Sequence, residues 1–150
     1  MKKSELRLVD YLEHIRVAIE KISDYTKNMT EDGFHRSDVV QDAVIRNMEI
    51  IGEASNNIQK DHEDFALNHP EIPLKIAYSM RNALSHGYFS VDIGMVWDTV
   101  ANDLPGLLQR VQHALEELLR SDHVRYAGKE ASVTDKARDI NTHADDAGPK

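Results

Sequence analysis

Residues 38–58 read DVVQDAVIRNMEIIGEASNNI and contain the clearest helical pattern in the chain. Ser37, just before this stretch, is a suitable N-cap. Large apolar side chains recur at intervals of three or four residues, which places them on one face of a helix: Val40, Val44, Met48, Ile51, Ala54 and Ile58. We therefore expect a long helix at roughly residues 38–60. Gly52 inside it costs about 1 kcal/mol relative to alanine, so we expect it to permit the close approach of another helix.

Two further segments carry the same periodicity. Residues 5–27 follow the candidate N-cap Ser4 and present Leu8, Leu12, Ile15, Ile19 and Ile22 on one face. A helix starting at Pro73, which suits a first helical turn, should end at Gly87, a residue that favours left-handed helix termination. Its expected apolar stripe is Ile76, Ala77, Met80, Ala83 and Leu84. Both Met48 and Met80 are read as core residues.

The last periodic segment follows Ser90 as N-cap, with Asp92 in its first turn. Its apolar residues are Ile93, Val96, Val100, Leu104, Leu107, Val111, Leu115 and Leu118. Pro105 should kink or split this helix, because a proline there removes a hydrogen bond and clashes with the preceding turn.

No strand-like alternation is present, so the predicted fold is all-α, an antiparallel bundle of four principal helices with short extra helical turns. Residues 1–120 should form one helical domain. Residues 121–150 hold few large apolar side chains and no sustained period, and we expect them to be a mobile tail.

Composition limits the function. The 150 residues include no Cys, and 18 Lys and Arg against 26 Asp and Glu give a net charge of −8. Such a chain gains little from general attraction to a polyanion, although a few Arg and His in a cleft can still bind phosphate. Apolar runs are short and no export signal is evident, so we expect no membrane segment and a cytoplasmic protein. The histidines lack metal-ligand spacing, which predicts no metal site.

Residues 80–89, MRNALSHGYF, are the richest in chemically useful side chains. Asn82 and His86 lie four residues apart on one helical face, where Asn82 can orient the imidazole. Arg81 lies about 140° around the helix axis from His86. A shared active site therefore needs long side chains that converge in a groove, or a second subunit.

The pattern R-N-x-x-x-H-x-Y, formed by Arg81, Asn82, His86 and Tyr88, resembles the signature of HEPN ribonucleases. The longer stretch MRNALSHGYFSVD at residues 80–92, together with DAVIRNMEIIGEASNNI at residues 42–58, resembles the HepT-like toxin subgroup in particular. Two separate blocks in the right order are more specific than the short Arg-to-His spacing alone.

This resemblance implies metal-independent endonucleolytic RNA cleavage by a homodimer, without a cofactor. Arg81 and His86 would be catalytic with the help of Asn82, and the ribose 2′-hydroxyl would attack the adjacent phosphate. It also implies a minimal nucleotidyltransferase antitoxin as partner, which modifies Tyr88 with AMP. The helix at residues 38–60 would contribute to the dimer interface, with Arg46, Glu49, Gly52 and Glu53 as candidate interface residues.

Simpler interpretations remain open. Arg81 can be a structural ion-pair residue and His86 a helix cap, whereas Arg46, Glu49 and Glu53 have the spacing of a solvated ion-pair face. Two other functions compete with the toxin: a non-catalytic HEPN module that serves as partner and substrate of a nucleotidyltransferase, and a purely structural dimeric bundle. A nucleotidyltransferase encoded next to this protein would support the regulatory part, and an RNA cleavage assay would separate the rest.

Overall fold

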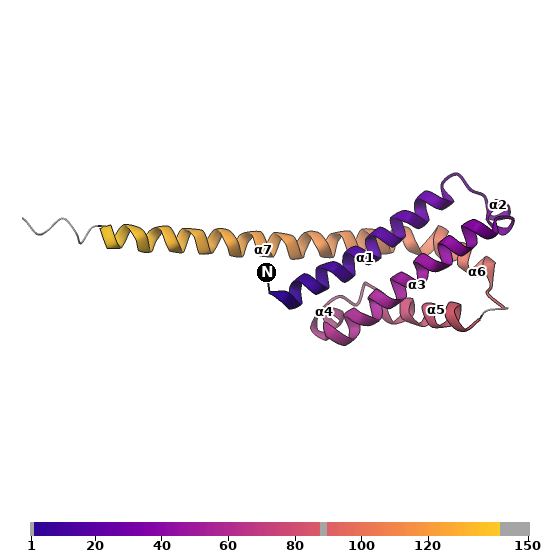
Figure 1. Ribbon diagram of the computed structural model, residues 1–150, viewed down its shortest axis with the longest axis horizontal. Coiled ribbons are helices and arrows are strands. Elements are labelled where there is room, and N and C mark those ends of the chain that lie inside the picture. The colour runs from indigo at the N-terminus through magenta and orange to yellow at the C-terminus, as the bar shows by residue number, and fades with distance from the viewer. Residues whose placement is uncertain (1, 88–89, 142–150) are drawn as a thin grey trace, which may run out of the picture. The chain divides into compact units, whose positions relative to one another are not determined.

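A computed structural model describes residues 2–87 and 90–141, with side chains through residue 122. The described backbone is helical and contains no strand, which confirms the all-α class. The elements are α1 (Lys3–Thr26), α2 (Glu31–His35), α3 (Asp38–Asp61), α4 (Glu63–Asn68), α5 (Leu74–His86), α6 (Ile93–Asp98), the π-helical η1 (Thr99–Asp103) and α7 (Leu104–Asn141) (Figure 1). Residues 1–115 and residues 116–150 form two separate units.

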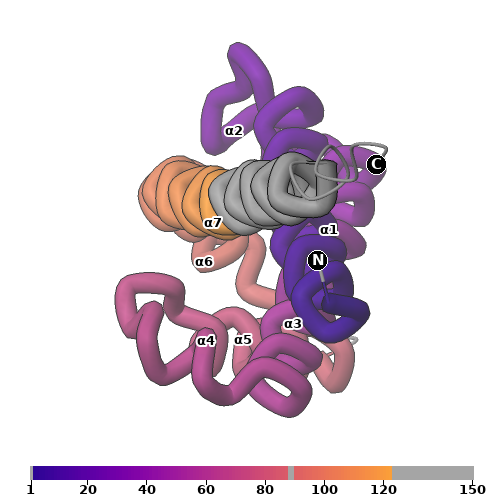
Figure 2. Tube along the Cα trace, turned by 90° about the vertical axis from the view of Figure 1, so that its left-hand side faces the viewer, coloured from indigo at the N-terminus to yellow at the C-terminus, as the bar shows by residue number. Residues whose placement is uncertain are grey.

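The first unit is built around α3, which packs against both α1 and α5 (Figures 1 and 2). Ser37 caps α3 as predicted, because its hydroxyl accepts a hydrogen bond from the Val40 N–H at 3.3 Å. The buried residues of α3 include every predicted apolar position from Val44 to Ile58. Two buried polar side chains bond to the helix's own carbonyls, Asn47 to Ala43 at 2.8 Å and Ser55 to Ile51 at 2.7 Å. The core therefore contains these polar groups without losing their hydrogen bonds.

Helix α1 buries the predicted stripe and adds Ala18 to it. Its predicted N-cap is wrong by two residues: the helix begins at Lys3, and Lys2 takes the cap position instead of Ser4.

The predicted cap of the α6 segment is also wrong. Asp92 caps α6 in place of Ser90, and its carboxylate accepts from the Met95 N–H at 3.1 Å. A carboxylate satisfies the free N–H and also complements the helix dipole, which a serine hydroxyl does not.

Pro105 splits the last segment as predicted. The α6 helix gives way to the π-helical turn η1, and α7 begins at Leu104, so Pro105 occupies the first turn of α7. The Leu104 N–H donates to the Thr99 carbonyl, five residues back. This wider turn shifts the register just ahead of the proline, which cannot donate a backbone hydrogen bond itself.

The second unit contains the rest of α7, whose helical backbone continues to Asn141. The apolar pattern ends near Arg120, so the helix extends beyond the part that the sequence predicted. The expected mobility of residues 121–150 stays a prediction. No helix within the described residues has both the length and the apolarity to cross a membrane.

The apolar stripe predicted for α5 is largely wrong. Of its five residues only Leu84 is buried, and Ile76 is 69% exposed. Leu74, at the start of α5, is buried instead. Helix α5 turns Ala77 and Arg81 toward α3, because Gly52 of α3 lets the two backbones approach there. The bulkier residues Ile76 and Met80 therefore face away from the tightest part of the α3–α5 contact.

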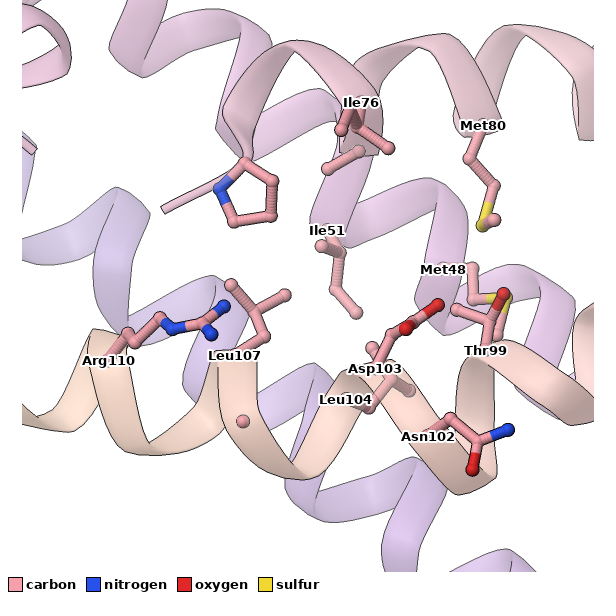
Figure 3. A pocket seen from close by; sticks show the side chains of 13 residues that line it. Met48, Ile51, Ile76, Met80, Thr99, Asn102, Asp103, Leu104, Leu107 and Arg110 are labelled. Atoms are coloured by element: carbon pink, nitrogen blue, oxygen red, sulfur yellow. The ribbon is translucent and has the colours of Figure 1, made fainter. Parts of the chain in front are cut away.

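Ile76 and Met80 instead line a groove of about 310 Å³ between α3, α5 and the η1–α7 junction. We call it the apolar groove. Its lining is Met48, Ile51, Pro73, Ile76, Ala77, Met80, Thr99, Asn102, Asp103, Leu104, Gly106, Leu107 and Arg110. Figure 3 shows Ile76 and Met80 on one side and Leu104, Leu107 and Arg110 on the other. Met48 is buried as predicted, whereas Met80 is only half-buried at the groove.

Candidate functional site

Arg81 lies directly against Gly52 at the contact between α5 and α3. A Cβ atom on residue 52 would overlap the Arg81 Cβ and come within 2.9 Å of both the Arg81 Cγ and the Ala77 carbonyl oxygen. This confirms that Gly52 permits a close helix approach, and it shows that the base of the Arg81 side chain occupies the space. Gly52, a candidate interface residue, is therefore buried inside the protomer.

Two neighbours hold the Arg81 guanidinium. Its Nη1 donates to the Asn82 Oδ1 at 3.0 Å, and its Nη2 lies 3.5 Å from the Glu53 Oε2. The Arg81 side chain is 33% exposed, and its Cβ and Cγ lie against Gly52. Asn82 was expected to orient His86, but its amide oxygen instead accepts from Arg81. In the described part of the chain no hydrogen bond joins Asn82 to His86.

Arg81 opens into a second groove, of about 300 Å³, between α1, α3 and α5. We call it the polar groove. Its lining is His14, Arg46, Glu49, Ile50, Glu53, Ala54, Asn57 and Arg81. Three of the four predicted interface candidates, Arg46, Glu49 and Glu53, therefore lie beside the predicted catalytic arginine. Their use in a dimer interface stays a prediction.

The polar groove contains as many arginines as glutamates. Arg46 lies 3.8 Å from Glu49 on the next turn of α3, and Arg81 pairs with Glu53 across the helix contact. Such a groove does not attract anions strongly by net charge. It can bind a phosphate only through donors held in a defined geometry.

His14 also lines the polar groove, although no motif or spacing in the sequence points to it. It lies on α1, 67 residues before Arg81 in a chain of 150 residues, and is exposed. Only the packing of α1 on α3 brings it near Arg81. A search for exposed polar positions flanking the buried stripe of α1 would have included His14, but among many others.

His86 is the last residue of α5 and is exposed. It does not belong to the lining of the polar groove. Arg81 therefore lines the polar groove without His86. Gly87 follows the helix end, although its φ of −100° is not left-handed, contrary to expectation. A side chain there would come within 2.9 Å of the Ala83 carbonyl, so the close contact calls for glycine. Tyr88 and Phe89 lie outside the described residues.

The remaining described histidines have local partners. His69 bonds to the Glu71 carboxylate at 2.8 Å and stacks on Phe65, with 4.2 Å between ring centroids. His62 packs edge-on against Tyr11. Among the described side chains, no group of three or more His, Cys, Asp or Glu is arranged to hold a metal ion.

Comparisons with known proteins identify the family of this chain. Residues 15–114 match the family model described as Ribonuclease HepT-like. A protein of Thermococcus cleftensis named "Probable ribonuclease HepT" is 47% identical over 98 residues, which cover 65% of this chain and 86% of that protein. A Methanocaldococcus jannaschii protein named "Gamma-glutamylcyclotransferase and putative RNase" is 43% identical over 116 residues, or 77% of this chain. This chain spans only 51% of the length of that protein.

No solved structure matched the chain. The family match covers more than half of the 150 residues and includes both α3 and the complete α5 segment. On that match, this chain belongs to the HepT-like ribonuclease family.

Proposed function

We propose that this protein is a toxin-type endoribonuclease that acts as a homodimer and needs no metal ion. A base removes the proton from a ribose 2′-hydroxyl, and the 2′-oxygen forms a bond to the adjacent phosphorus. The bond from phosphorus to the 5′-oxygen breaks, and that oxygen takes a proton from an acid. The products are a 2′,3′-cyclic phosphate and a free 5′-hydroxyl.

The geometry of Arg81 carries this proposal. Its base is fixed against Gly52, while its guanidinium reaches the polar groove with N–H donors that no described residue takes up. An arginine has five such donors in a planar fork that matches phosphate oxygens. Fixed donors of this kind stabilise the negative charge that builds on a phosphate in the transition state.

His86 would supply the proton transfers, since an imidazole exchanges protons near neutral pH. It lies exposed at the end of α5 and outside the polar groove, so a site with both residues is best completed by a second subunit. The two His86 side chains of a dimer would then divide the acid and base roles. Light scattering at micromolar concentration should give the mass of a dimer, and a monomer would contradict the composite site.

Inhibition by a partner is the regulatory part of the proposal. A minimal nucleotidyltransferase antitoxin would transfer AMP from ATP to the Tyr88 hydroxyl, releasing pyrophosphate. The added phosphate would bring negative charge close to the catalytic residues and exclude RNA. A Tyr88→Phe protein should cleave RNA normally and resist inactivation by the cognate enzyme with ATP. Mass spectrometry that finds AMP on another residue would contradict this assignment.

One assay tests the reaction itself. The purified protein is incubated with RNA in excess EDTA, and the new ends are identified. We expect cyclic phosphate and 5′-hydroxyl ends at undiminished rate. Cleavage that stops in EDTA would contradict the metal-independent mechanism. If the protein cleaves no RNA with or without metal ions, the non-catalytic binding module becomes the better assignment.

A further inference from the structure

Glu49 and Glu53 lie one turn apart on α3, and both line the polar groove. They differ in the arginine that each contacts. Glu49 lies 3.8 Å from Arg46 of its own helix, whereas Glu53 lies 3.5 Å from Arg81 of α5. Glu53 immediately follows Gly52, so the turn of α3 that admits the base of Arg81 also places a carboxylate at the far end of the same side chain.

We propose that Glu53 is a positioning residue, which orients Arg81 for the phosphate of the RNA in the reaction proposed above. Arginine has a long side chain that loses rotamer freedom when it is fixed. Asn82 holds the Arg81 Nη1 and Glu53 holds the Nη2, so both terminal nitrogens have an anchor. Two anchors define the plane of the guanidinium, and the remaining N–H donors are then directed at a ligand. This inference depends on the proposed ribonuclease function.

Glu53 has two opposite effects on RNA in this scheme. Its contact orders the guanidinium, which favours the transition state, and its negative charge repels the phosphate, which weakens RNA binding. Removal of the charge should therefore lower kcat and also lower KM. A residue that serves only to stabilise the fold would not produce this combination, because partial unfolding lowers the active fraction and leaves KM unchanged.

The test compares Glu53→Gln with Glu49→Gln. Both variants remove one charge from the polar groove and keep the size of the side chain, but only the first removes the negative charge that pairs with Arg81. For Glu53→Gln we expect kcat to fall by about 10- to 100-fold, the effect of misplacing a catalytic group by about 1 Å. We expect KM to fall about two- to fivefold in both variants, a range typical of a weak surface charge interaction. Glu49→Gln should keep kcat within about twofold by the same reasoning on orientation.

A third variant controls for the loss of any carboxylate. Glu20 pairs with Arg16 within α1 at 2.8 Å and does not line the groove, so Glu20→Gln should change neither constant. Glu53→Asp tests recovery, because it restores the charge on a shorter side chain and should recover part of kcat. A Glu53→Gln protein with wild-type kcat, or a Glu49→Gln protein with the same loss, would overturn the proposal.

A second measurement does not depend on catalysis. Nitrogen-15 NMR of the arginine side chains in the RNA-free protein reports how fast each guanidinium rotates, and Arg81→Lys identifies the Arg81 signal. We expect rotation of the Arg81 guanidinium to become faster in Glu53→Gln and to stay slow in Glu49→Gln. Equal rotation in all variants would overturn the positioning role. If the wild type cleaves no RNA, the proposed function fails, and this measurement alone decides whether Glu53 orients Arg81.

Discussion

The polar groove and the apolar groove have nearly the same volume, about 300 and 310 Å³, and helices α3 and α5 line both. The polar groove is lined mainly by charged and polar side chains, whereas the apolar groove is lined mainly by aliphatic and methionine side chains. On α5, Met80 lines the apolar groove and Arg81 lines the polar one, because consecutive residues of a helix lie about 100° apart around its axis. Helices α3 and α5 thus present ion-paired side chains to the polar groove and aliphatic and thioether groups to the apolar groove.

The two grooves also differ in what fixes their side chains. In the polar groove Arg81 is held by Gly52 beneath it and by two polar neighbours at its end. In the apolar groove Ile76 is 69% exposed and has only weak, undirected contacts available. Catalysis needs side chains held in a defined geometry. We therefore expect substitutions in the polar groove and in the apolar groove to differ in their effects on RNA cleavage and on stability.

The largest difference should appear in catalysis. Arg81→Ala and His86→Ala should each lower RNA cleavage by at least about 10²-fold, within the 10²–10⁴-fold range typical of a lost acid or base. Met80→Ala changes the adjacent residue in the apolar groove and should keep the turnover of the folded protein. Cleavage rates, measured beside circular dichroism and gel filtration, test the contrast. Similar losses for Met80→Ala and Arg81→Ala would show that the polar groove has no special role.

The next largest difference should be in stability, between substitutions on the buried face and on the exposed face of α5. Leu84 is 5% exposed, and Leu84→Ala should destabilise the protein by about 2–5 kcal/mol, as expected for a truncated core leucine. Ile76→Ala removes a similar amount of apolar side chain at the apolar groove and should change the free energy of unfolding by less than about 0.5 kcal/mol. Urea denaturation measures both. A large loss for Ile76→Ala would mean that the apolar groove is filled in solution.

The next comparison is between two glycines. Gly52 lies at the contact between α3 and α5, and Gly106 lines the apolar groove. Gly52→Ala should destabilise the protein by about 1–3 kcal/mol, because the added carbon overlaps Arg81 and nears the Ala77 carbonyl. Gly106→Ala, in the apolar groove, places its Cβ 4.0 Å from the flexible end of Arg110 and should stabilise by up to about 1 kcal/mol. Thermal unfolding of both variants checks the signs. Equal effects would mean that the α3–α5 contact has room for a side chain.

The smallest effect concerns a carboxylate near the apolar groove. The hydrogen bond from His69 lowers the pKa of Glu71, with help from its own backbone N–H and the charge of Arg110. The resulting stability is present above the unfolded pKa of the carboxyl group and is lost as the pH falls through the lowered folded pKa. His69→Ala should raise the pKa of Glu71 in an NMR titration and leave RNA cleavage unchanged. An unaltered titration curve would show that the hydrogen bond is absent in solution.

Much of the fold follows from local pattern. The helices at α1, α3 and α5, the cap at Ser37 and the break at Pro105 were all predicted, because periodicity, capping and the missing proline N–H act over a few residues. Other local details were wrong. Ser4 and Ser90 lost their cap positions to Lys2 and Asp92, since several residues near a helix start can take that role.

At the candidate site, too, some features were predicted from the sequence and others were not. The sequence alone selected Arg81, Asn82 and His86 and assigned Gly52 to a close helix contact. The sequence predicted that Asn82 orients His86, whereas in the structure the Asn82 Oδ1 accepts a hydrogen bond from Arg81. It also could not reveal that His14 shares a groove with Arg81, because that requires knowing how α1 lies on α3.

The sequence by itself determined that this chain is all-helical, where its main helices lie, and which short motif carries reactive side chains. These properties depend on residues within one or two turns of each other. Only the tertiary structure decided which face of α5 is buried, that Gly52 meets Arg81 in particular, and that Glu53 stands at the end of that arginine. Each of these depends on the rotation of one helix about its axis relative to another. Periodicity leaves that rotation open when small, apolar and charged residues compete for the same contact.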